Sequence, residues 1–346
     1  MNVETRMYRE AAQAAGAVRL QLEANAADMR SLGAELRKLA PRAVVTSARG
    51  SSDHAATFAK YLIETRAGVL TSSAAPSLSS VYDARQDLNG VLFLAISQSG
   101  KSPDLLATVE HAKAGGAYVV ALCNSPDSPL SRTAHFAIDL RAGVETSVAA
   151  TKSYIASLTA IVHLLGSWTM ERELLDALEQ TPALLEQSWS LDWSQAIAVL
   201  QPAVNLFVVG RGYGLGIAQE AALKLPETCG LHAEGFSSAE VQHGPMALVG
   251  KGFPVLAFSQ SDETRAGIES MARDFIARGA SVLLAGTRVD GAINLPTLAL
   301  PTLAARAVIE PVLMIQSFYR LAATLAVARG FDPDVPPHLR KVTETM

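Results

Sequence analysis

The chain has 346 residues, of which 49% are hydrophobic and 18% are charged, so it can bury one large or two medium domains, and intrinsic disorder is excluded. Its net charge of −4 comes without a basic block, which excludes the charge pattern typical of nucleic-acid-binding proteins.

The N-terminus, the apolar stretches and the cysteines point to a cytoplasmic protein. The first ten residues, MNVETRMYRE, are polar and do not resemble a secretory signal peptide. The most apolar stretch, residues 154–168, contains Ser157, Thr159 and His163, so we expect a buried helix rather than a membrane span. Cys123 and Cys229 match neither a metal-binding spacing nor a disulfide framework. We expect no membrane and no nucleic-acid partner.

After a helical segment over residues 1–40, strand-like runs alternate with helical patterns. The apolar runs expected to be strands are AVVTSA (43–48), VLFLAI (91–96) and AYVVALC (117–123). The helix after the first run has an i, i+3, i+4, i+7 apolar face made of Ala55, Phe58, Ala59 and Leu62. A second helix is predicted over 103–115. Almost wholly apolar strands that alternate with helices predict an α/β fold with a parallel sheet covered on both faces.

The same motifs occur twice at a constant offset of 162 residues. SARGSS (47–52) corresponds to VGRGYG (209–214), and LAISQS (94–99) corresponds to LAFSQS (256–261). Two matching motifs in one register predict an internal duplication, with its junction around Thr181-Pro182.

The duplication divides the chain into four predicted parts: an N-terminal helical segment (1–40), a first domain (41–182), a second domain (183–330) and a C-terminal tail (331–346). The second domain ends with a long helix over 309–330 that Gly330 terminates. The tail is rich in proline and charge, so we expect an extended arm rather than a core element.

The stretch SQSGKSPD (97–104) has the composition of a phosphate-binding turn. Ser102 suits a helix N-cap, Pro103 the first helical position and Asp104 the first turn. Free amide N–H groups and the helix dipole attract phosphate to such a site. Side chains that can donate to phosphate oxygens come from Ser97, Gln98, Ser99 and Ser102. A well-capped helix without a ligand is the alternative.

The second copy of this turn is expected to have lost phosphate binding. It keeps the serine–glutamine–serine sequence (259–261) but has Asp262 and Glu263 in place of Gly100 and Lys101. Two carboxylates repel a phosphate, so we expect only the first copy to bind one.

Two stretches of small residues are candidate sugar-binding segments. In ARGSSDH (48–54), Gly50 permits close backbone approach and Ser52 can bond a polyol. In ETSVAATKSY (145–154), backbone groups can line a pocket before a buried helix. A plain helix cap and a plain loop are the alternatives.

Residues 220–245 form the densest group of ionisable side chains in an apolar context. Lys224 and Glu227 lie three residues apart on a predicted helix, where they form either a surface ion pair or part of a site. SSAE (237–240) predicts a capping box, so His243 ends a short helix. A histidine and a glutamate beside one cleft suit proton transfer, whereas a helix-end histidine by itself is structural.

Six motifs in one order resemble the sugar isomerase (SIS) domain family: ARGSS, SQSGKSPD, SVAATK, ALKLPE, HAEGFSSAEVQHGP and PHLRKVT. The likeness runs from about Ala43 to the C-terminus. It is strongest to the isomerase half of the glucosamine-fructose-6-phosphate aminotransferases and to SIS-type glucosamine-6-phosphate deaminases. The resemblance implies two tandem SIS domains, each a five-stranded parallel sheet flanked by helices, that act on a sugar phosphate.

The resemblance also implies roles for single residues. Glu227 matches the base that moves a proton between C1 and C2, with Lys224 near it. His243 matches the ring-opening histidine, which in this family comes from the neighbouring subunit, so a homodimer is expected. Lys341 matches a lysine that forms an imine with the open sugar, in a tail that closes over the active site. The phosphate and the sugar are contacted by Ser97, Gln98, Ser99, Ser102, Ser52 and the backbone near Val148.

The departures from the family pattern narrow the expected function. Asn2 stands where the aminotransferases have a cysteine, and no glutaminase domain is expected. Ala150 replaces a usual serine, and Arg340 replaces a small residue before the tail lysine. The resemblance therefore predicts a glucosamine-6-phosphate deaminase that releases fructose 6-phosphate and ammonia without metal or cofactor. A deglycase of sugar-phosphate–amino-acid conjugates and a non-catalytic sensor are the alternatives.

Overall fold

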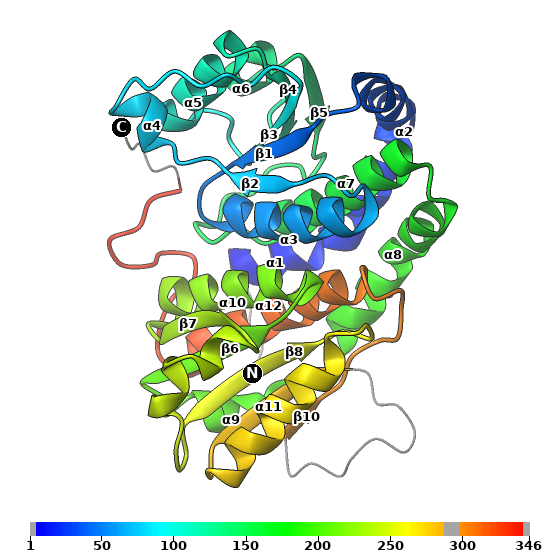
Figure 1. Cartoon of the computed structure of the whole chain (residues 1–346). Coiled ribbons are helices and arrows are strands. Elements are labelled where there is room, and N and C mark those ends of the chain that lie inside the picture. Colours follow the sequence, from blue (N-terminus) through cyan, green and yellow to red (C-terminus); the bar gives the residue numbers. More distant parts are fainter. Residues whose placement is uncertain (1–4, 287–297, 342–346) are drawn as a thin grey trace. The chain divides into compact units, whose positions relative to one another are not determined.

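The computed structural model describes residues 5–286 and 298–341, and within these residues the chain divides into two compact units (Figure 1). The N-terminal unit is built from Gly16–Glu145, Lys152–Pro182 and the chain from Arg340 onward. The C-terminal unit is built from the chain up to Ala15, Thr146–Thr151 and Ala183–Leu339. Residues 342–346 of the predicted tail lie outside the described residues.

The N-terminal unit contains a parallel sheet of five described strands in the order β2-β1-β3-β4-β5. The strands are β1 (Ala43–Ser47), β2 (Thr71–Ser73), β3 (Val91–Ser97), β4 (Tyr118–Cys123) and β5 (Phe136–Asp139). The helices are α2 (Ala14–Leu39), α3 (Ser51–Arg66), α4 (Ser77–Ser80), α5 (Pro103–Ala114), α6 (Pro129–Thr133) and α7 (Lys152–Thr169). The helices α3 and α7 lie side by side on one face of the sheet, and α5 and α6 cover the other face (Figure 1).

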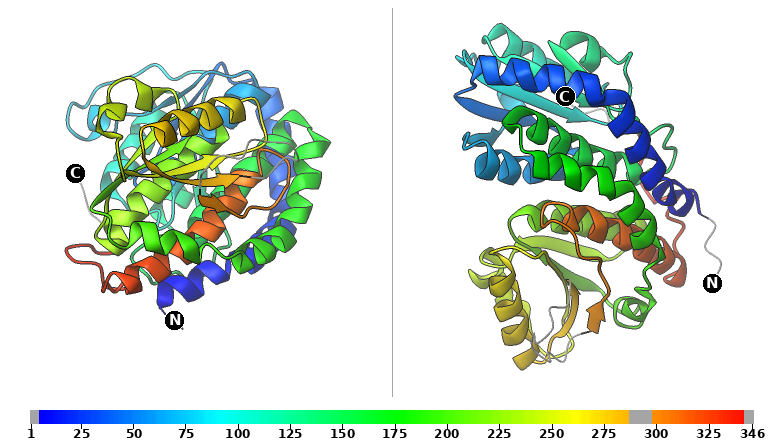
Figure 2. Two further views of the ribbon diagram at one scale, coloured as in Figure 1. Left: turned by 90° about the horizontal axis from the view of Figure 1, so that it is seen from below. Right: turned by 90° about the vertical axis from the view of Figure 1, so that its right-hand side faces the viewer.

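The C-terminal unit contains a second parallel sheet of five described strands, in the order β10-β9-β8-β6-β7. The strands are β6 (Asn205–Gly210), β7 (His232–Ser237), β8 (Pro254–Ser259), β9 (Ser281–Gly286) and β10 (Leu298–Leu300). The helical elements are α1 (Arg6–Ala12), η1 (Ser194–Ala196), α9 (Ile197–Leu200), α10 (Tyr213–Cys229), η2 (Glu240–Gln242), η3 (Pro245–Leu248), α11 (Arg265–Ala277) and α12 (Glu310–Ala328). Helices α10 and α12 pack together on one face, and α11 covers the other (Figure 2).

The two sheets confirm the predicted duplication and the predicted α/β class. Reading β7-β6-β8-β9-β10 against β2-β1-β3-β4-β5 gives the same strand order. The backbone repeats in detail as well, because Gly50 (φ 54°, ψ −130°) and Gly212 (φ 58°, ψ −129°) precede α3 and α10 in the same conformation. Positive φ with strongly negative ψ strains any residue with a Cβ, which explains the glycine in both copies.

The central strands and helices are buried because both faces of each sheet are covered. All residues of β3 and β8 are buried, and so is α7 from its first residue to Trp168. This confirms the expectation that residues 154–168 form a buried helix. Among the described helices, α12 also has the length and apolar composition of a membrane span, but 78% of that apolar window is buried within the protein. A helix in the core of a protein can have the same length and apolar composition as a membrane span.

The two units divide the chain between Pro182 and Ala183, next to the expected junction at Thr181-Pro182, and this point lies inside α8 (Arg172–Ser190). The expected N-terminal helical segment is divided, because α1 belongs to the C-terminal unit and most of α2 to the N-terminal unit. Asp334 of the tail accepts the amides of Arg6 (2.6 Å) and Met7 (2.8 Å), which ties the tail to α1.

Candidate active site

The turn after β3, where a phosphate site is predicted, is tight and depends on Gly100. Ser97 ends the strand, and its Oγ accepts the Gly100 amide at 3.0 Å. Gly100 has φ +63°, and a Cβ there would lie 2.3 Å from Ser128 Oγ, so the tight turn depends on glycine. Ser102 occupies the N-cap position of α5 and Pro103 its first turn, as predicted. Among the described residues, however, the Ser102 side chain caps no amide of α5. Its hydroxyl is therefore available for another acceptor or donor.

The side chains of this turn differ in their exposure. Ser97 is buried, Gln98, Ser99 and Ser102 are half-buried, and Lys101 is exposed. A row of half-buried polar groups at the carboxyl end of a parallel strand is the usual place for a ligand in α/β proteins.

The second copy of the turn is occupied by its own carboxylates. Asp262 Oδ1 accepts the amide of Thr264 at 2.9 Å, and Glu310 Oε2 accepts the amide of Ser261 at 2.6 Å. Gln260 Nε2 donates to the carbonyl of Arg211 (2.7 Å) and to Asp262 Oδ2 (3.0 Å). These contacts place negative charge where a phosphate would have to bind, which gives a structural reason for the predicted loss of binding.

The turn before α3 places Ser52 in the first turn of the helix, half-buried. The neighbouring Asp53 is also half-buried, and burial raises its pKa above 3.8 although His54 and Arg49 oppose the shift. Ser52 lies in the N-terminal unit, as does the turn after β3.

Helix α10 carries a buried group of charges. Lys224 Nζ is hydrogen-bonded to Glu227 Oε2 and lies 3.6 Å from Glu220 Oε1, and the hydroxyl of Tyr319 donates to Glu220 at 3.0 Å. The side chains of Lys224 and Glu220 are 1% and 0% exposed, whereas Glu227 is 21% exposed. The interpretation of Lys224 and Glu227 as a surface ion pair is therefore wrong. The group leaves one carboxylate, that of Glu227, partly open to solvent.

The internal duplication shows that the fold does not need these charges. Helix α3 has Phe58 and Leu62 where α10 has Glu220 and Lys224, and both apolar side chains are fully buried. Buried charges are costly unless they are paired, so their presence in one copy only points to chemistry rather than to folding.

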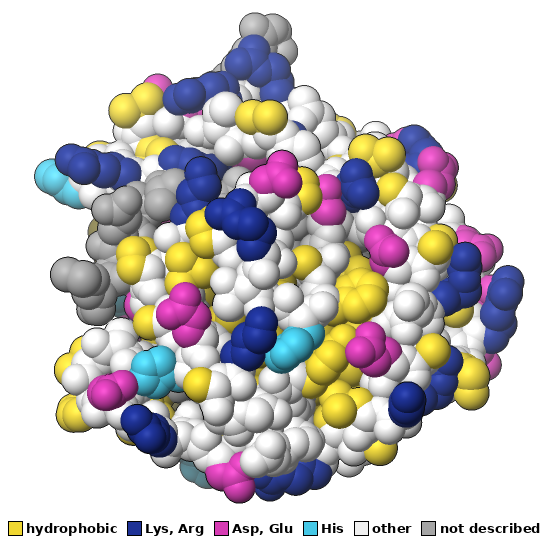
Figure 3. Space-filling model, turned by 90° about the horizontal axis from the view of Figure 1, so that it is seen from above, with side chains coloured by type: hydrophobic (Ala, Val, Ile, Leu, Met, Phe, Trp, Pro, Cys, Tyr) yellow, Lys and Arg dark blue, Asp and Glu magenta, His cyan; other side chains and the backbone are white. Residues whose placement is uncertain are grey.

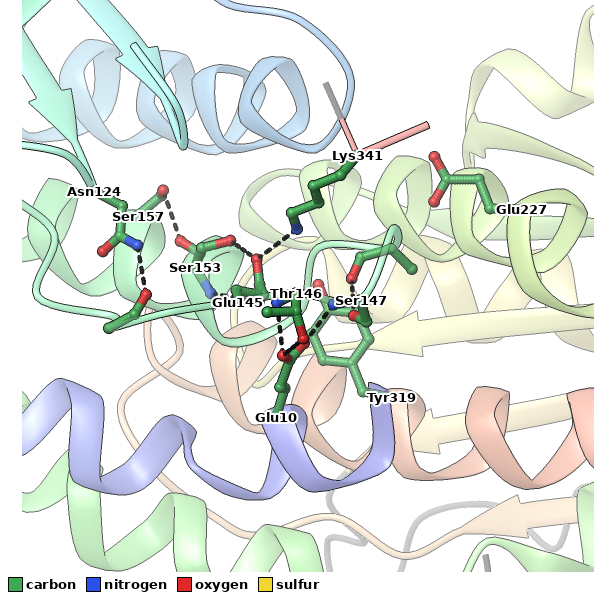
Figure 4. Close-up of polar contacts among 12 residues, drawn as sticks. Glu10, Asn124, Glu145, Thr146, Ser147, Ser153, Ser157, Glu227, Tyr319 and Lys341 are labelled. Atoms are coloured by element: carbon green, nitrogen blue, oxygen red, sulfur yellow. Dashed lines mark hydrogen bonds and ion pairs between the residues drawn. The ribbon is translucent and has the colours of Figure 1, made fainter. Parts of the chain in front are cut away.

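Residues Thr146–Thr151 form a segment that Glu10 of α1 holds in place (Figure 4). The Glu10 carboxylate accepts the amide of Thr146 (2.6 Å), its hydroxyl (2.8 Å) and the amide of Ser147 (3.0 Å). Burial raises the pKa of Glu10, but these hydrogen bonds outweigh it, and the pKa lies below 4.5. Val148 and Ala150 follow in this segment, half-buried.

Lys341 of the tail is not an exposed lysine. Its Nζ lies 3.4 Å from Oε2 of Glu145, its side chain is 25% exposed, and the Glu145 side chain is fully buried (Figure 4). Ser153 Oγ donates to the same carboxylate oxygen at 2.5 Å. The tail lysine thus has a fixed position within the N-terminal unit.

His243 is exposed and follows the short helix η2, as predicted. Ser237 Oγ accepts the amide of Glu240 at 3.0 Å, which is half of the predicted capping box; no return bond from the Glu240 side chain is found among the described residues.

The predicted site residues fall into two groups. The N-terminal unit holds Ser52, Ser97, Gln98, Ser99, Ser102 and Lys341. The C-terminal unit holds Lys224, Glu227, His243, Val148 and Ala150. The sequence interpretation missed Glu10, Glu145, Glu220 and Tyr319. Glu220 had a usable signal, because it lies four residues before Lys224 on the same helix.

Within the described residues, no group of three or more histidine, cysteine, aspartate or glutamate side chains is placed to hold a metal ion. On the face drawn in Figure 3, basic and acidic side chains are interspersed, and its described residues form no continuous basic stripe.

The chain belongs to the SIS domain family, because residues 40–166 and 199–295 match the sequence pattern of the SIS domain. It is 34% identical to a glutamine–fructose-6-phosphate aminotransferase of Aeropyrum pernix in an alignment 309 residues long that covers 84% of this chain and 49% of that protein. The chain spans about half the length of the curated relatives it matches.

Solved structures share the fold over almost the whole chain. A candidate phosphosugar isomerase from Silicibacter pomeroyi is 41% identical with a TM-score of 0.90, covering 95% of this chain and 100% of that one. A glucosamine-6-phosphate deaminase from Thermotoga maritima has a TM-score of 0.77 over 99% of this chain and 100% of that one, at 19% identity, and shows the fold alone.

Proposed function

We propose that the protein is a glucosamine-6-phosphate deaminase, which converts glucosamine 6-phosphate and water into fructose 6-phosphate and ammonia. The observation that carries the proposal is the Glu227 carboxylate, partly exposed and fixed by the buried Lys224. Two relatives, a glutamine–fructose-6-phosphate aminotransferase and a candidate phosphosugar isomerase, are named for sugar phosphates, which supports the substrate class.

The proposed reaction is a proton shift followed by hydrolysis. His243 opens the pyranose ring, which gives the C1 aldehyde. Glu227 removes the proton from C2, whose acidity comes from the neighbouring carbonyl, and returns a proton to C1 through an enol-amine. C1 becomes a hydroxymethyl group and C2 an imine. Lys224 holds the Glu227 carboxylate in place at the start of this cycle.

The C2 imine then loses its nitrogen. Water adds to C2, and the nitrogen leaves as ammonia, so that the carbonyl of fructose 6-phosphate remains. Where the Lys341 amine adds to C2 before water does, ammonia leaves and the ketose is held at C2 as an imine of Lys341, and water then adds to C2 and releases the lysine. Ser52 and the segment around Val148 and Ala150 contact the hydroxyl groups of the sugar. The phosphate bound by the turn after β3 anchors the substrate, because remote binding orients the reacting carbons.

The direct test is ammonia release by the purified protein from a panel of amino-sugar phosphates, without glutamine. We expect ammonia and fructose 6-phosphate from glucosamine 6-phosphate. Cleavage of a fructosamine-type sugar-phosphate conjugate in its place would establish the deglycase, and binding without turnover of either would establish a sensor.

The variant Glu227→Gln tests the assigned base. It keeps the shape of the side chain but removes the base, so the rate should fall by about 10²–10⁴-fold with a smaller change in KM. Glu234→Gln, at a half-exposed glutamate of β7, is the matched control and should keep full activity. Equal activity of the two variants would exclude Glu227 as the base.

We also propose a cytoplasmic homodimer in which His243 serves the partner's active site. If so, mixing His243→Ala with Glu227→Gln subunits creates hybrids with one intact pair of catalytic residues, and about one quarter of wild-type activity returns. If His243 serves its own subunit, no hybrid has an intact pair and mixing restores nothing.

A further inference from the structure

Arg49, in the turn between β1 and α3, makes a contact that the proposed function does not use. Its Nε donates to Asp104 Oδ2 at 2.8 Å, and its Nη2 lies 2.6 Å from the same oxygen. The two side chains have opposite environments, because that of Arg49 is 54% exposed and that of Asp104 only 1%. The guanidinium is thus tied to a buried anchor while much of it faces solvent.

Asp104 places this guanidinium at the start of α5. It is the second residue of the helix, two positions after Ser102, and its Oδ1 accepts the amide of Leu105 at 2.8 Å. A buried carboxylate needs a charged partner, so the Arg49 position is well determined. Two of the five guanidinium N–H groups donate to Asp104, and a planar fork with further donors matches the oxygens of a phosphate.

The internal duplication separates a ligand role from a folding role. Arg211 occupies the Arg49 position of the second copy, and its Nη1 lies 3.5 Å from where a side chain on Gly267 of α11 would begin. The position that corresponds to Asp104 is Ala266, so the acidic anchor is missing there. The acidic anchor, Asp104, is present in the copy whose turn has Gly100 and Lys101. It is absent from the second copy, where Asp262 is hydrogen-bonded within the turn. Both copies fold into the same sheet, so folding does not require the anchored arginine.

We propose that Arg49 is a further phosphate-binding residue of the turn after β3, and that Asp104 is a positioning residue that holds its guanidinium there. The proposal rests on the proposed function only in that the ligand is a phosphate monoester. Arg49 also interacts with the half-buried Asp53. A held guanidinium loses little side-chain freedom when the phosphate arrives, which favours binding although Asp104 offsets part of its charge.

The test is the affinity of the purified full chain for inorganic phosphate and for fructose 6-phosphate, measured by calorimetry. Arg49→Gln should weaken both by about 10- to 100-fold, the effect of one charge-assisted contact, and Ser97→Ala provides the reference loss. Arg49→Lys keeps the charge without the fork and should recover part of the affinity. Arg211→Gln is the matched control, with unchanged affinity expected.

The sign of the Asp104→Asn effect distinguishes positioning from plain electrostatics. As a positioning residue, Asp104 should weaken phosphate binding when it is replaced, and this effect should vanish when Arg49 is already glutamine. If Asp104 acted only through its negative charge, its replacement would strengthen binding. That result, or unchanged affinity in Arg49→Gln, or no measurable phosphate binding by the wild type, would overturn the proposal.

The outcome is independent of the proposed activity. Weaker phosphate binding by Arg49→Gln in a protein that releases no ammonia would support this inference and refute the deaminase. Full ammonia release with unchanged phosphate affinity and KM in Arg49→Gln would support the deaminase and refute this inference.

Discussion

Replacing Glu10 with glutamine tests whether one carboxylate holds the predicted sugar-binding segment. The two Thr146 contacts converge on Oε1, and the Ser147 amide donates to Oε2. A glutamine oxygen can keep the first two contacts, but its NH₂ group then faces the Ser147 N–H, and two donors cannot bond. One charge-assisted hydrogen bond is lost, which costs about 1.5–3 kcal/mol.

Hydrogen exchange measures this loss locally. The Ser147 amide exchanges through opening of the segment, so at pH 7 we expect about 10- to 100-fold faster exchange in Glu10→Gln. KM for the sugar phosphate should rise, because Val148 and Ala150 lie in the same segment. Glu23→Gln, at an exposed glutamate of α2, should change neither quantity.

The pH dependence of the same experiment has a definite sign. The folded-state pKa of Glu10 lies below its ordinary value of 4.5, so its stabilisation is complete above that value and is lost as the pH falls through the folded pKa. Exchange free energies of wild type and variant should therefore converge on acidification from pH 7. A difference that stays constant down to pH 3, or is absent at pH 7, would refute the role of the ionised carboxylate.

Two further substitutions test the buried charges and the phosphate-binding turn. Lys224→Met leaves buried carboxylates without their ammonium and should lower the unfolding free energy by about 3–5 kcal/mol in denaturant titrations, whereas Lys251→Met at an exposed lysine should lower it by less than about 0.5 kcal/mol. By the same measurement, Gly100→Ala should lower the unfolding free energy by about 1–3 kcal/mol more than Gly68→Ala. Both glycines have positive φ, but of the two only a Cβ at Gly100 would meet another described atom within 4 Å. An equal loss in the two variants would contradict the close contact with Ser128.

The fold was predictable because its signals are local. Apolar strand-like runs, a glycine before α3 and before α10, and a constant offset between motifs can all be read within short windows, and they predicted the parallel sheets and the duplication. The two units divide between Pro182 and Ala183, inside a helix rather than at its end. Helix α8 continues through the predicted junction, because a proline within a long helical pattern does not necessarily end it.

The supporting residues of the candidate site were not predictable, because their partners are distant in sequence. Glu10 lies 136 residues before Thr146, and Lys341 lies 196 residues after Glu145. A glutamate on a surface-type helix and a lysine in a proline-rich tail carry no local sign of such contacts. The phosphate-binding candidates were predicted from the composition of their turn, and the roles of the catalytic candidates came from resemblance to the SIS family.

The two copies of the fold have diverged in opposite directions. The first has an apolar helix face, Phe58 and Leu62, and a turn with Gly100 and Lys101; the second has charges on its helix and a turn in which Asp262 accepts the amide of Thr264. In the proposed function, the phosphate-binding turn and the base stand on different copies of the fold. A duplicated sheet with the same glycine turn in both halves makes that separation possible without a change of fold.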